Sequence, residues 1–183
     1  MDDVMFSSSS DEWATPQPLF DQINEVFGPF NLDPCGNAQN HKAERVFGPD
    51  ARYPKDRDGL AAKWAVYGRA ANVFVNPPFS REKKMPIEPW IEKAWHEIRI
   101  GNASQVVMLI PARTETRIWH HVIFPHAKVI AFVKGRIQFD GVTKSGKPAS
   151  ATFPSAIVVF TRAPAGGDPR FRGQTITTWE QRR

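Results

Sequence analysis

The tetrapeptide Asn76-Pro77-Pro78-Phe79 follows the apolar run Val73-Phe74-Val75 and restricts the fold of this chain more than any other segment. A short β-rich run that stops at two prolines predicts a strand whose end has a fixed shape, because each proline locks φ and lacks an N–H. Pro77 also disfavours the helical region for Asn76. We therefore expect a rigid, extended corner at the carboxyl edge of a sheet, where open α/β folds bind their ligands.

In such a corner two hydrogen-bond acceptors can point the same way: the side-chain oxygen of Asn76 and the backbone carbonyl of Pro77. Two convergent acceptors suit a planar amino group, which donates two hydrogens. Phe79 would add an apolar face on which a flat heterocycle can stack. Asn and Pro are also common turn formers, so an ordinary turn is the alternative interpretation of this segment by itself.

The net charge of +5 is unevenly distributed along the chain. Residues 1–12 carry four acidic side chains and no basic one, so the remainder of the chain carries +9. A basic body favours a polyanionic partner, most often nucleic acid, although a merely basic surface fits the charge equally well. Cys35 is the single cysteine, which excludes an intrachain disulfide and a cysteine-based zinc site.

At 183 residues the chain is long enough for one domain with a full core and short for two. No apolar run approaches the roughly 20 residues of a membrane span, and no signal peptide is recognised, so we expect a cytoplasmic protein without a membrane partner. Residues 1–11 are polar and Ser-rich and predict a disordered tail. We expect one domain over residues 12–162 and a basic extension over residues 163–183.

Hydrophobic periodicity predicts an α/β fold. Thr15 suits the N-cap of a first helix, with Pro16 at its first position and Gly28 at its end. The almost wholly apolar run Gln105–Ile110 predicts a central strand buried on both faces. The other expected elements are strands over 30–33, 44–47, 72–75, 128–133 and 156–160, a helical turn near 60–64, and helices over 87–98 and 115–123. No helix separates the last two strands, so they should pair as a terminal antiparallel hairpin on a mostly parallel sheet.

Seven segments together resemble the phage-type DNA N6-adenine methyltransferase family, over roughly residues 11–161. In order they are residues 11–16, 31–34, 58–60, 76–79, 108–113, 134–136 and 153–155. The resemblance implies a class I methyltransferase (Rossmann-like) fold, S-adenosylmethionine as cofactor, and the N6 amino group of adenine in DNA as acceptor. It also implies action in the cytoplasm of a bacterial or phage-infected cell.

The resemblance assigns roles to individual residues. The implied cofactor-binding residues are Trp13, Thr15, Pro16, Asp33, Pro34, Asp58 and Leu60, and the implied catalytic residues are Asn76, Pro77, Pro78 and Phe79. Backbone N–H groups at the helix start near Thr15 could bind the cofactor's carboxylate, and Asp33 could accept from its ammonium group or ribose. Asp58 and Leu60, together with Trp64, could face the adenine ring of the cofactor. A turn cap and core residues are the alternative there.

The expected DNA-facing residues lie on loops that follow strands and could surround the catalytic corner. They are Ser80, Arg81, Arg113, Lys134 and Arg136. The chain has no room for a separate recognition domain, so specificity would come from these loops or from a partner. Neither the target site nor the oligomeric state follows from the sequence. We expect no metal, because His120, His121 and His126 lack nearby cysteines or convergent carboxylates.

Two other functions are compatible with the same sequence. The Asn-Pro-Pro-Phe motif is shared with methyltransferases that act on guanine in RNA and on glutamine in proteins. A methyltransferase for RNA or for a protein amide is therefore the first alternative. A nucleic-acid-binding relative without catalytic activity is the second.

Overall fold

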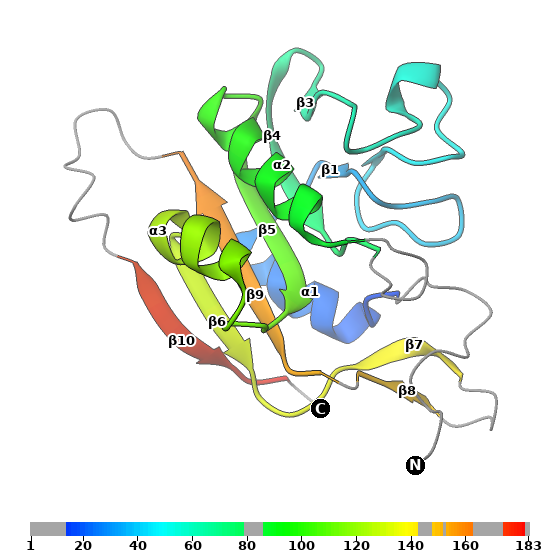
Figure 1. The fold of residues 1–183 in the computed structure, drawn as a ribbon. Coiled ribbons are helices and arrows are strands. Elements are labelled where there is room, and N and C mark those ends of the chain that lie inside the picture. Colours follow the sequence, from blue (N-terminus) through cyan, green and yellow to red (C-terminus); the bar gives the residue numbers. More distant parts are fainter. Residues whose placement is uncertain (1–13, 79–85, 143–147, 152, 163–173, 182–183) are drawn as a thin grey trace.

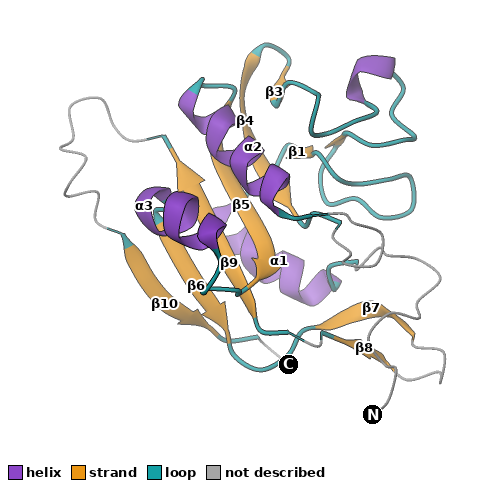
Figure 2. Cartoon of the chain, viewed as in Figure 1, coloured by secondary structure: helices purple, strands orange, loops and turns teal. Residues whose placement is uncertain are grey.

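A computed structural model describes residues 14–78, 86–142, 148–151, 153–162 and 174–181 (Figures 1 and 2). Its elements are α1 (Gln17–Phe27), β1 (Leu32–Asp33), β2 (Arg45–Val46), η1 (Pro54–Asp56), β3 (Ala65–Val66), β4 (Arg69–Val75), α2 (Glu88–Arg99), β5 (Ala103–Pro111), η2 (Trp119–Ile123), α3 (Phe124–His126), β6 (Val129–Val133), β7 (Gln138–Val142), β8 (Pro148–Ser150), β9 (Ser155–Thr161) and β10 (Thr175–Trp179). None of the helices within these ranges has the length and apolar character needed to traverse a membrane.

A sheet of eight strands forms the centre of the molecule, in the order β10-β6-β9-β5-β4-β1-β2, with β3 paired to β4 outside this path (Figure 1). Neighbours on the path are parallel except at β9, which is antiparallel to both β5 and β6. The parallel strands therefore end at one side of the sheet, here called the carboxyl edge. The predicted α/β class with a mostly parallel sheet is confirmed.

Helices cover both faces of the sheet, with α2, η2 and α3 on one face and α1 on the other (Figures 1 and 2). The middle strand β5 explains this arrangement, because its successive side chains point to opposite faces of the sheet. Val106, Met108 and Ile110 belong to the core cluster that contains α2, whereas Val107 and Leu109 belong to the cluster that contains α1. All five side chains are buried, as expected for a central strand between two helical layers.

The first helix differs at its start from the sequence-based expectation. α1 begins at Gln17 with Pro16 as N-cap, and no side chain caps it. Thr15, the predicted N-cap, precedes the cap and directs its hydroxyl to Asn76. The end of the helix agrees with the prediction, because Gly28 follows its last residue.

The predicted antiparallel pairing of the strands over 128–133 and 156–160 is confirmed by β6 and β9. The connection between them contains a second, small sheet of β7 and β8, which the sequence did not indicate. Phe139 of β7 lies in the same core cluster as Leu19 and Phe20 of α1. The small sheet is therefore anchored to the α1 layer and projects from the carboxyl edge (Figure 1).

The C-terminal region contributes a strand to the central sheet, so its description as a tail from residue 163 was wrong in part. β10 pairs in parallel with the whole of β6. Trp179 stacks on Phe27 at the end of α1, with ring centroids 6.0 Å apart. Gln174 donates from Nε2 to the backbone carbonyls of Phe124 and Ala127, both at 2.9 Å. β10 thus extends the predicted domain past residue 162.

Candidate active site

Asn76 lies where the sequence predicts a fixed corner, directly after β4 at the carboxyl edge. β4 lies between β1 and β5, with Leu32 opposite Val73 and Met108 opposite Val75. The ends of β1, β4 and β5 therefore meet around Asn76. Asn76 is half-buried and Pro77 is buried.

Asn76 is held by two segments that are distant from it in the chain. Its side-chain Nδ2 donates to Thr15 Oγ1 at 3.0 Å, across 61 residues of sequence. Its backbone carbonyl accepts from the Cys35 thiol at 3.3 Å, across 41 residues. The corner is thereby tied to the segment before α1 and to the turn after β1.

Asp33 shapes that turn from within the protein. Its side chain is 5% exposed and accepts from the backbone N–H groups of Cys35 at 3.2 Å and Lys42 at 3.0 Å. Burial raises the pKa of Asp33 above its usual value, and these hydrogen bonds offset part of the rise. Both carboxylate oxygens thus serve the local backbone, so Asp33 holds the shape of the loop that follows β1.

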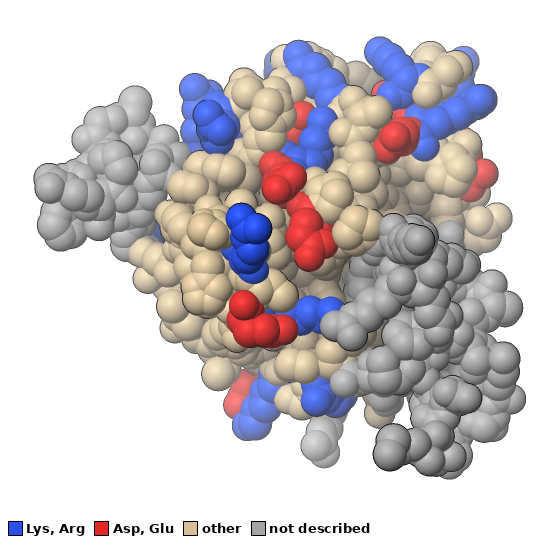
Figure 3. Space-filling model, viewed as in Figure 1, with Lys and Arg blue, Asp and Glu red and all other residues tan. Residues whose placement is uncertain are grey.

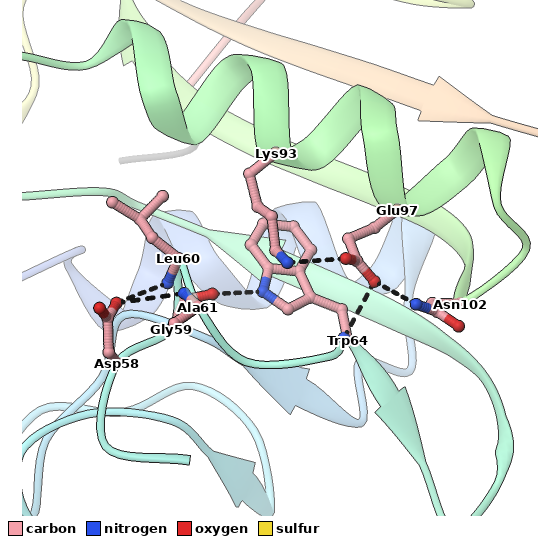
Figure 4. Close-up of polar contacts among 8 residues, drawn as sticks. All are labelled: Asp58, Gly59, Leu60, Ala61, Trp64, Lys93, Glu97 and Asn102. Atoms are coloured by element: carbon pink, nitrogen blue, oxygen red, sulfur yellow. Dashed lines mark hydrogen bonds and ion pairs between the residues drawn. The ribbon is translucent and has the colours of Figure 1, made fainter. Parts of the chain in front are cut away.

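The segment Asp58-Gly59-Leu60 also reaches the carboxyl edge. Asp58 Oδ1 accepts from the backbone N–H groups of Leu60 at 2.9 Å and Ala61 at 3.3 Å, which is the turn-cap interpretation (Figure 4). A Cβ on Gly59 would lie 1.7 Å from the backbone oxygen of Pro34, so this position admits only glycine. The close approach places the segment against the turn after β1.

Trp64 belongs to the core and cannot face a cofactor, so the core alternative holds for it. Its side chain is fully buried, and Nε1 donates to the Gly59 carbonyl at 2.7 Å (Figure 4). The predicted helical turn nearby is a single hydrogen-bonded turn, from Ala62 N–H to the Asp58 carbonyl. Trp64 thus supports the Asp58-Gly59-Leu60 segment from its core side, through the hydrogen bond to the Gly59 carbonyl.

Glu97 of α2 is a buried carboxylate that holds Trp64 in place (Figure 4). It accepts from the Trp64 backbone N–H at 3.0 Å, from Asn102 Nδ2 at 2.7 Å and from Lys93 Nζ at 2.7 Å. Burial alone would raise the pKa of Glu97, but these hydrogen bonds and the Lys93 charge outweigh it and lower the pKa below its usual value.

Sequence reasoning missed a pocket of about 190 Å³ beside the turn after β1. Its lining residues are Gly36, Asn37, Ala38, His41, Glu44, Val46, Gly48, Asp50 and Ala51. Glu44 and Asp50 give it two carboxylates, and Asp50 Oδ2 also accepts from the Ala38 backbone N–H at 3.1 Å. The sequence could have indicated these two carboxylates by their position next to a strand, since Glu44 immediately precedes β2 and Asp50 follows it.

The predicted DNA-facing residues are only partly described by the structure. Arg113 is half-buried just beyond β5, and Lys134 and Arg136 are exposed just beyond β6, all at the carboxyl edge. Lys134 pairs with Glu180 at 2.9 Å, next to the end of β10. The predicted site residues Trp13, Phe79, Ser80 and Arg81 lie outside the described residues.

A further group of cations surrounds η1 and was not singled out from the sequence. Figure 3 shows Lys and Arg side chains over the cyan segment of Figure 1, where Arg52, Lys55 and Arg57 are exposed. Tyr53, 45% exposed, lies under the guanidinium groups of Arg45 and Arg52. Within the ranges that the structure covers, no three His, Cys, Asp or Glu side chains gather as metal ligands would.

A comparison with protein families identifies the chain. The model of the family described as DNA N-6-adenine-methyltransferase (Dam) matches residues 4–177. The chain belongs to the Dam family. The match ends at residue 177, within β10, and so extends past residue 162 into the strand that completes the sheet.

Relatives support this membership. The chain is 26% identical to the DNA N-6-adenine-methyltransferase of Escherichia phage T1, over 71% of this chain and 48% of the phage protein. It is 36% identical to YfdM of Escherichia coli K12, named as a methyltransferase, over 38% of this chain and 71% of YfdM. The chain thus spans about half the length of the phage T1 relative.

A solved structure from Listeria monocytogenes, described as a class I S-adenosylmethionine-dependent methyltransferase, has the same fold. The TM-score is 0.52 at 12% identity, over 93% of this chain and 67% of the other. The predicted class I methyltransferase fold is therefore confirmed for this Dam family member.

Proposed function

We propose that this protein transfers a methyl group from S-adenosylmethionine to the N6 amino group of adenine in DNA. Dam family membership and the class I fold support the proposal. The observation that carries it is the corner Asn76-Pro77, placed at the carboxyl edge between the ends of β1 and β5. Such a reaction on DNA would take place in the cytoplasm of a bacterial or phage-infected cell.

The residues around the corner fit this cofactor. The amino end of α1 lies beside Asn76, because Thr15 contacts that side chain, and a helix amino terminus favours a carboxylate. The pocket after β1 offers Glu44 and Asp50, whose carboxylates are suitable acceptors for hydroxyl or ammonium groups. We propose that these elements hold the cofactor together with Pro16, Pro34 and the Asp58-Gly59-Leu60 segment, and that Asp33 acts by shaping the turn.

The chain's own part in the reaction is to hold the acceptor amine. When bound, S-adenosylmethionine supplies a methyl group that is already activated on a sulfonium sulfur. An adenine flipped out of the duplex, at a cost of roughly a few kcal/mol, would form hydrogen bonds from its N6 amino group to Asn76 Oδ1 and the Pro77 carbonyl. As the methyl group passes to N6, S-adenosylhomocysteine is the leaving group and one N6 proton is released to solvent. Two acceptors hold the amino nitrogen in one orientation and increase its electron density, which is catalysis by positioning and electrostatics.

Stacking would hold the flipped base in the same corner. Phe79 follows the two prolines and is the proposed stacking surface, worth about 1–3 kcal/mol for one base. Arg113, Lys134 and Arg136 are the proposed phosphate or base contacts at the carboxyl edge, together with Ser80 and Arg81. Lys134 pairs with Glu180 through an exposed contact, with which a DNA phosphate would compete.

Methyl transfer from labelled cofactor to DNA, RNA and protein in parallel tests the proposal. We expect label in DNA, recovered after digestion as N6-methyladenine, and its loss in Asn76→Ala. Arg69→Ala is the matched active control, because Arg69 is exposed at the opposite end of β4. Label in RNA or protein and not in DNA would overturn the proposal in favour of the corresponding acceptor. Cofactor binding without transfer to any of the three would favour the non-catalytic alternative.

A further inference from the structure

The side chain of Asn76 has two chemically opposite ends of nearly equal size. Its oxygen accepts hydrogen bonds and its nitrogen donates them, and a half-turn of the amide exchanges the two without changing its shape. An amino group that is to be methylated brings only hydrogens to this corner. The proposed reaction therefore needs the oxygen of Asn76 to face the substrate and the nitrogen to face away from it.

Thr15 meets the nitrogen end. Its side chain is 1% exposed, and its Oγ1 accepts from Asn76 Nδ2 at 3.0 Å. A threonine in front of a helix usually caps it, yet α1 has Pro16 as N-cap and no side-chain cap. The Thr15 hydroxyl is therefore committed to Asn76 instead of the helix. Because Nδ2 is directed at Thr15, Oδ1 lies on the other side of the amide.

Cys35 holds the backbone of the same residue. Its thiol lies 3.3 Å from the Asn76 carbonyl and 3.7 Å from Asp33 Oδ1, so the Asn76 carbonyl is the nearer acceptor for its one proton. Its own backbone N–H donates to Asp33 Oδ1 at 3.2 Å. The turn after β1 is thus connected through Cys35 to the peptide that joins Asn76 to Pro77. Burial, with the nearby Asp33 carboxylate, raises the pKa of the Cys35 thiol well above its usual value. The thiol therefore keeps its proton as a donor and is a poor nucleophile.

We infer that Thr15 and Cys35 are positioning residues, which hold the amide and the backbone of Asn76 so that Asn76 Oδ1 and the Pro77 carbonyl face the acceptor amine. This inference rests on the proposed function for its catalytic consequence. It gives Thr15 a role through Asn76, besides or in place of the cofactor contact that the family resemblance implies. The contact itself exists whether or not DNA is the substrate.

The decisive variant is Thr15→Val, which keeps the branched shape and removes the acceptor. We expect its single-turnover methylation rate at saturating cofactor to fall roughly tenfold, the equivalent of one hydrogen bond, with unchanged cofactor affinity. Thr15→Ser restores the hydroxyl and should recover most of the rate. Thr177→Val, on exposed β10, is the matched control and should behave as wild type.

Cys35 gives a smaller and separable effect. Cys35→Ser keeps a donor and should retain most of the rate, whereas Cys35→Ala should lower it roughly threefold, since a thiol is a weak donor. Thermal midpoints of all variants, compared with wild type, separate positioning from loss of fold. Equal rates for Cys35→Ser and Cys35→Ala would overturn the assignment of Cys35.

A readout independent of methylation tests the Thr15 contact directly. In ¹⁵N spectra, the side-chain amide of Asn76, assigned by its absence in Asn76→Ala, should exchange slowly with solvent in wild type and Thr15→Ser. It should exchange fast in Thr15→Val. If the amide responds but DNA is not methylated, the proposed function fails and the contact stands.

Two outcomes would overturn the positioning role of Thr15. The first is a Thr15→Val rate that returns to the wild-type value at saturating cofactor, which would make Thr15 a cofactor-binding residue. The second is an Asn76 amide whose exchange is unchanged in Thr15→Val, which would show that Thr15 does not hold it.

Discussion

Two regions of the molecule are stabilised in different ways: the Asn76-Pro77 corner, and the Asp58–Trp64 segment, which reaches the carboxyl edge only at its Asp58–Leu60 end. The Asn76-Pro77 corner is held by single hydrogen bonds from uncharged groups, Thr15 and Cys35, which come from other parts of the chain. The Asp58–Trp64 segment is held by its own turn and by the buried carboxylate of Glu97. Neutral hydrogen bonds therefore fix the orientation of Asn76 in the corner, whereas the Asp58–Trp64 segment depends on the buried, ionised carboxylate of Glu97.

The difference has consequences for what each region can tolerate. Loss of a neutral hydrogen bond in the corner would change the direction of the Asn76 side chain. We therefore expect such a loss to lower the rate of methylation and to change stability little. Loss of Glu97 would leave the Trp64 N–H and Asn102 without their acceptor inside the protein, so we expect its cost in stability. Four predictions test this division.

The largest expected effect is that of Asn76→Ala. Removal of the side-chain acceptor should lower the single-turnover rate at least about 100-fold, as for other positioned catalytic groups, while cofactor still binds. Asn72→Ala on the same strand is the matched control. Asn72 Nδ2 donates to the carbonyls of Phe27 and Pro29, so this variant should lose stability and keep its rate. A rate for Asn76→Ala above a tenth of wild type would argue against its catalytic role.

The second prediction concerns Glu97. Glu97→Ala should lower the free energy of unfolding by about 2–3 kcal/mol, because buried donors lose their partner. Glu97→Gln, which keeps one acceptor, should cost less. Glu92→Ala, on the same helix and exposed, should be within about 0.5 kcal/mol of wild type in urea denaturation. If Glu97→Ala proves as mild as Glu92→Ala, the buried carboxylate does not hold the segment.

A pH series sharpens the same comparison. The pKa of Glu97 is lowered in the folded protein from its usual value of 4.5. Its ionised form therefore contributes stability that is present above pH 4.5 and is lost as the pH falls through the lower, folded pKa. The difference in unfolding free energy between wild type and Glu97→Gln should shrink in that acidic range. A difference that is constant from neutral pH to pH 3 would contradict this linkage.

The smallest expected effects are those of the arginines at the rim of the edge. Arg113→Ala and Arg136→Ala should each weaken DNA binding and lower its salt slope by about one unit for each phosphate that the arginine neutralises. Arg69→Ala, at the opposite end of β4, should leave the slope unchanged. Salt titrations of DNA binding give the slopes. Identical slopes for all three variants would place the DNA on another face, and the cations around η1 would be the next candidates.

Local patterns predicted most of the fold. α2 and β5 were recognisable because their apolar residues repeat at the helical spacing or form a continuous buried run, and both were found close to their predicted bounds. β10 was missed because its residues Thr175–Trp179 are mostly polar and exposed. This segment is a strand because it pairs with the neighbouring β6, and a pairing between residues about 46 positions apart cannot be recognised from the local sequence.

The candidate site divides in the same way. Two consecutive prolines restrict the backbone through their own rings, so the sequence alone determined a rigid corner at Asn76 and, with the ordered motifs, the Dam family. Only the tertiary structure decided that Thr15 serves Asn76 instead of capping α1, and that Trp64 belongs to the core. The physical reason is that a hydroxyl or an indole has several possible partners of similar energy. Which one it meets depends on the packing of segments far apart in the chain.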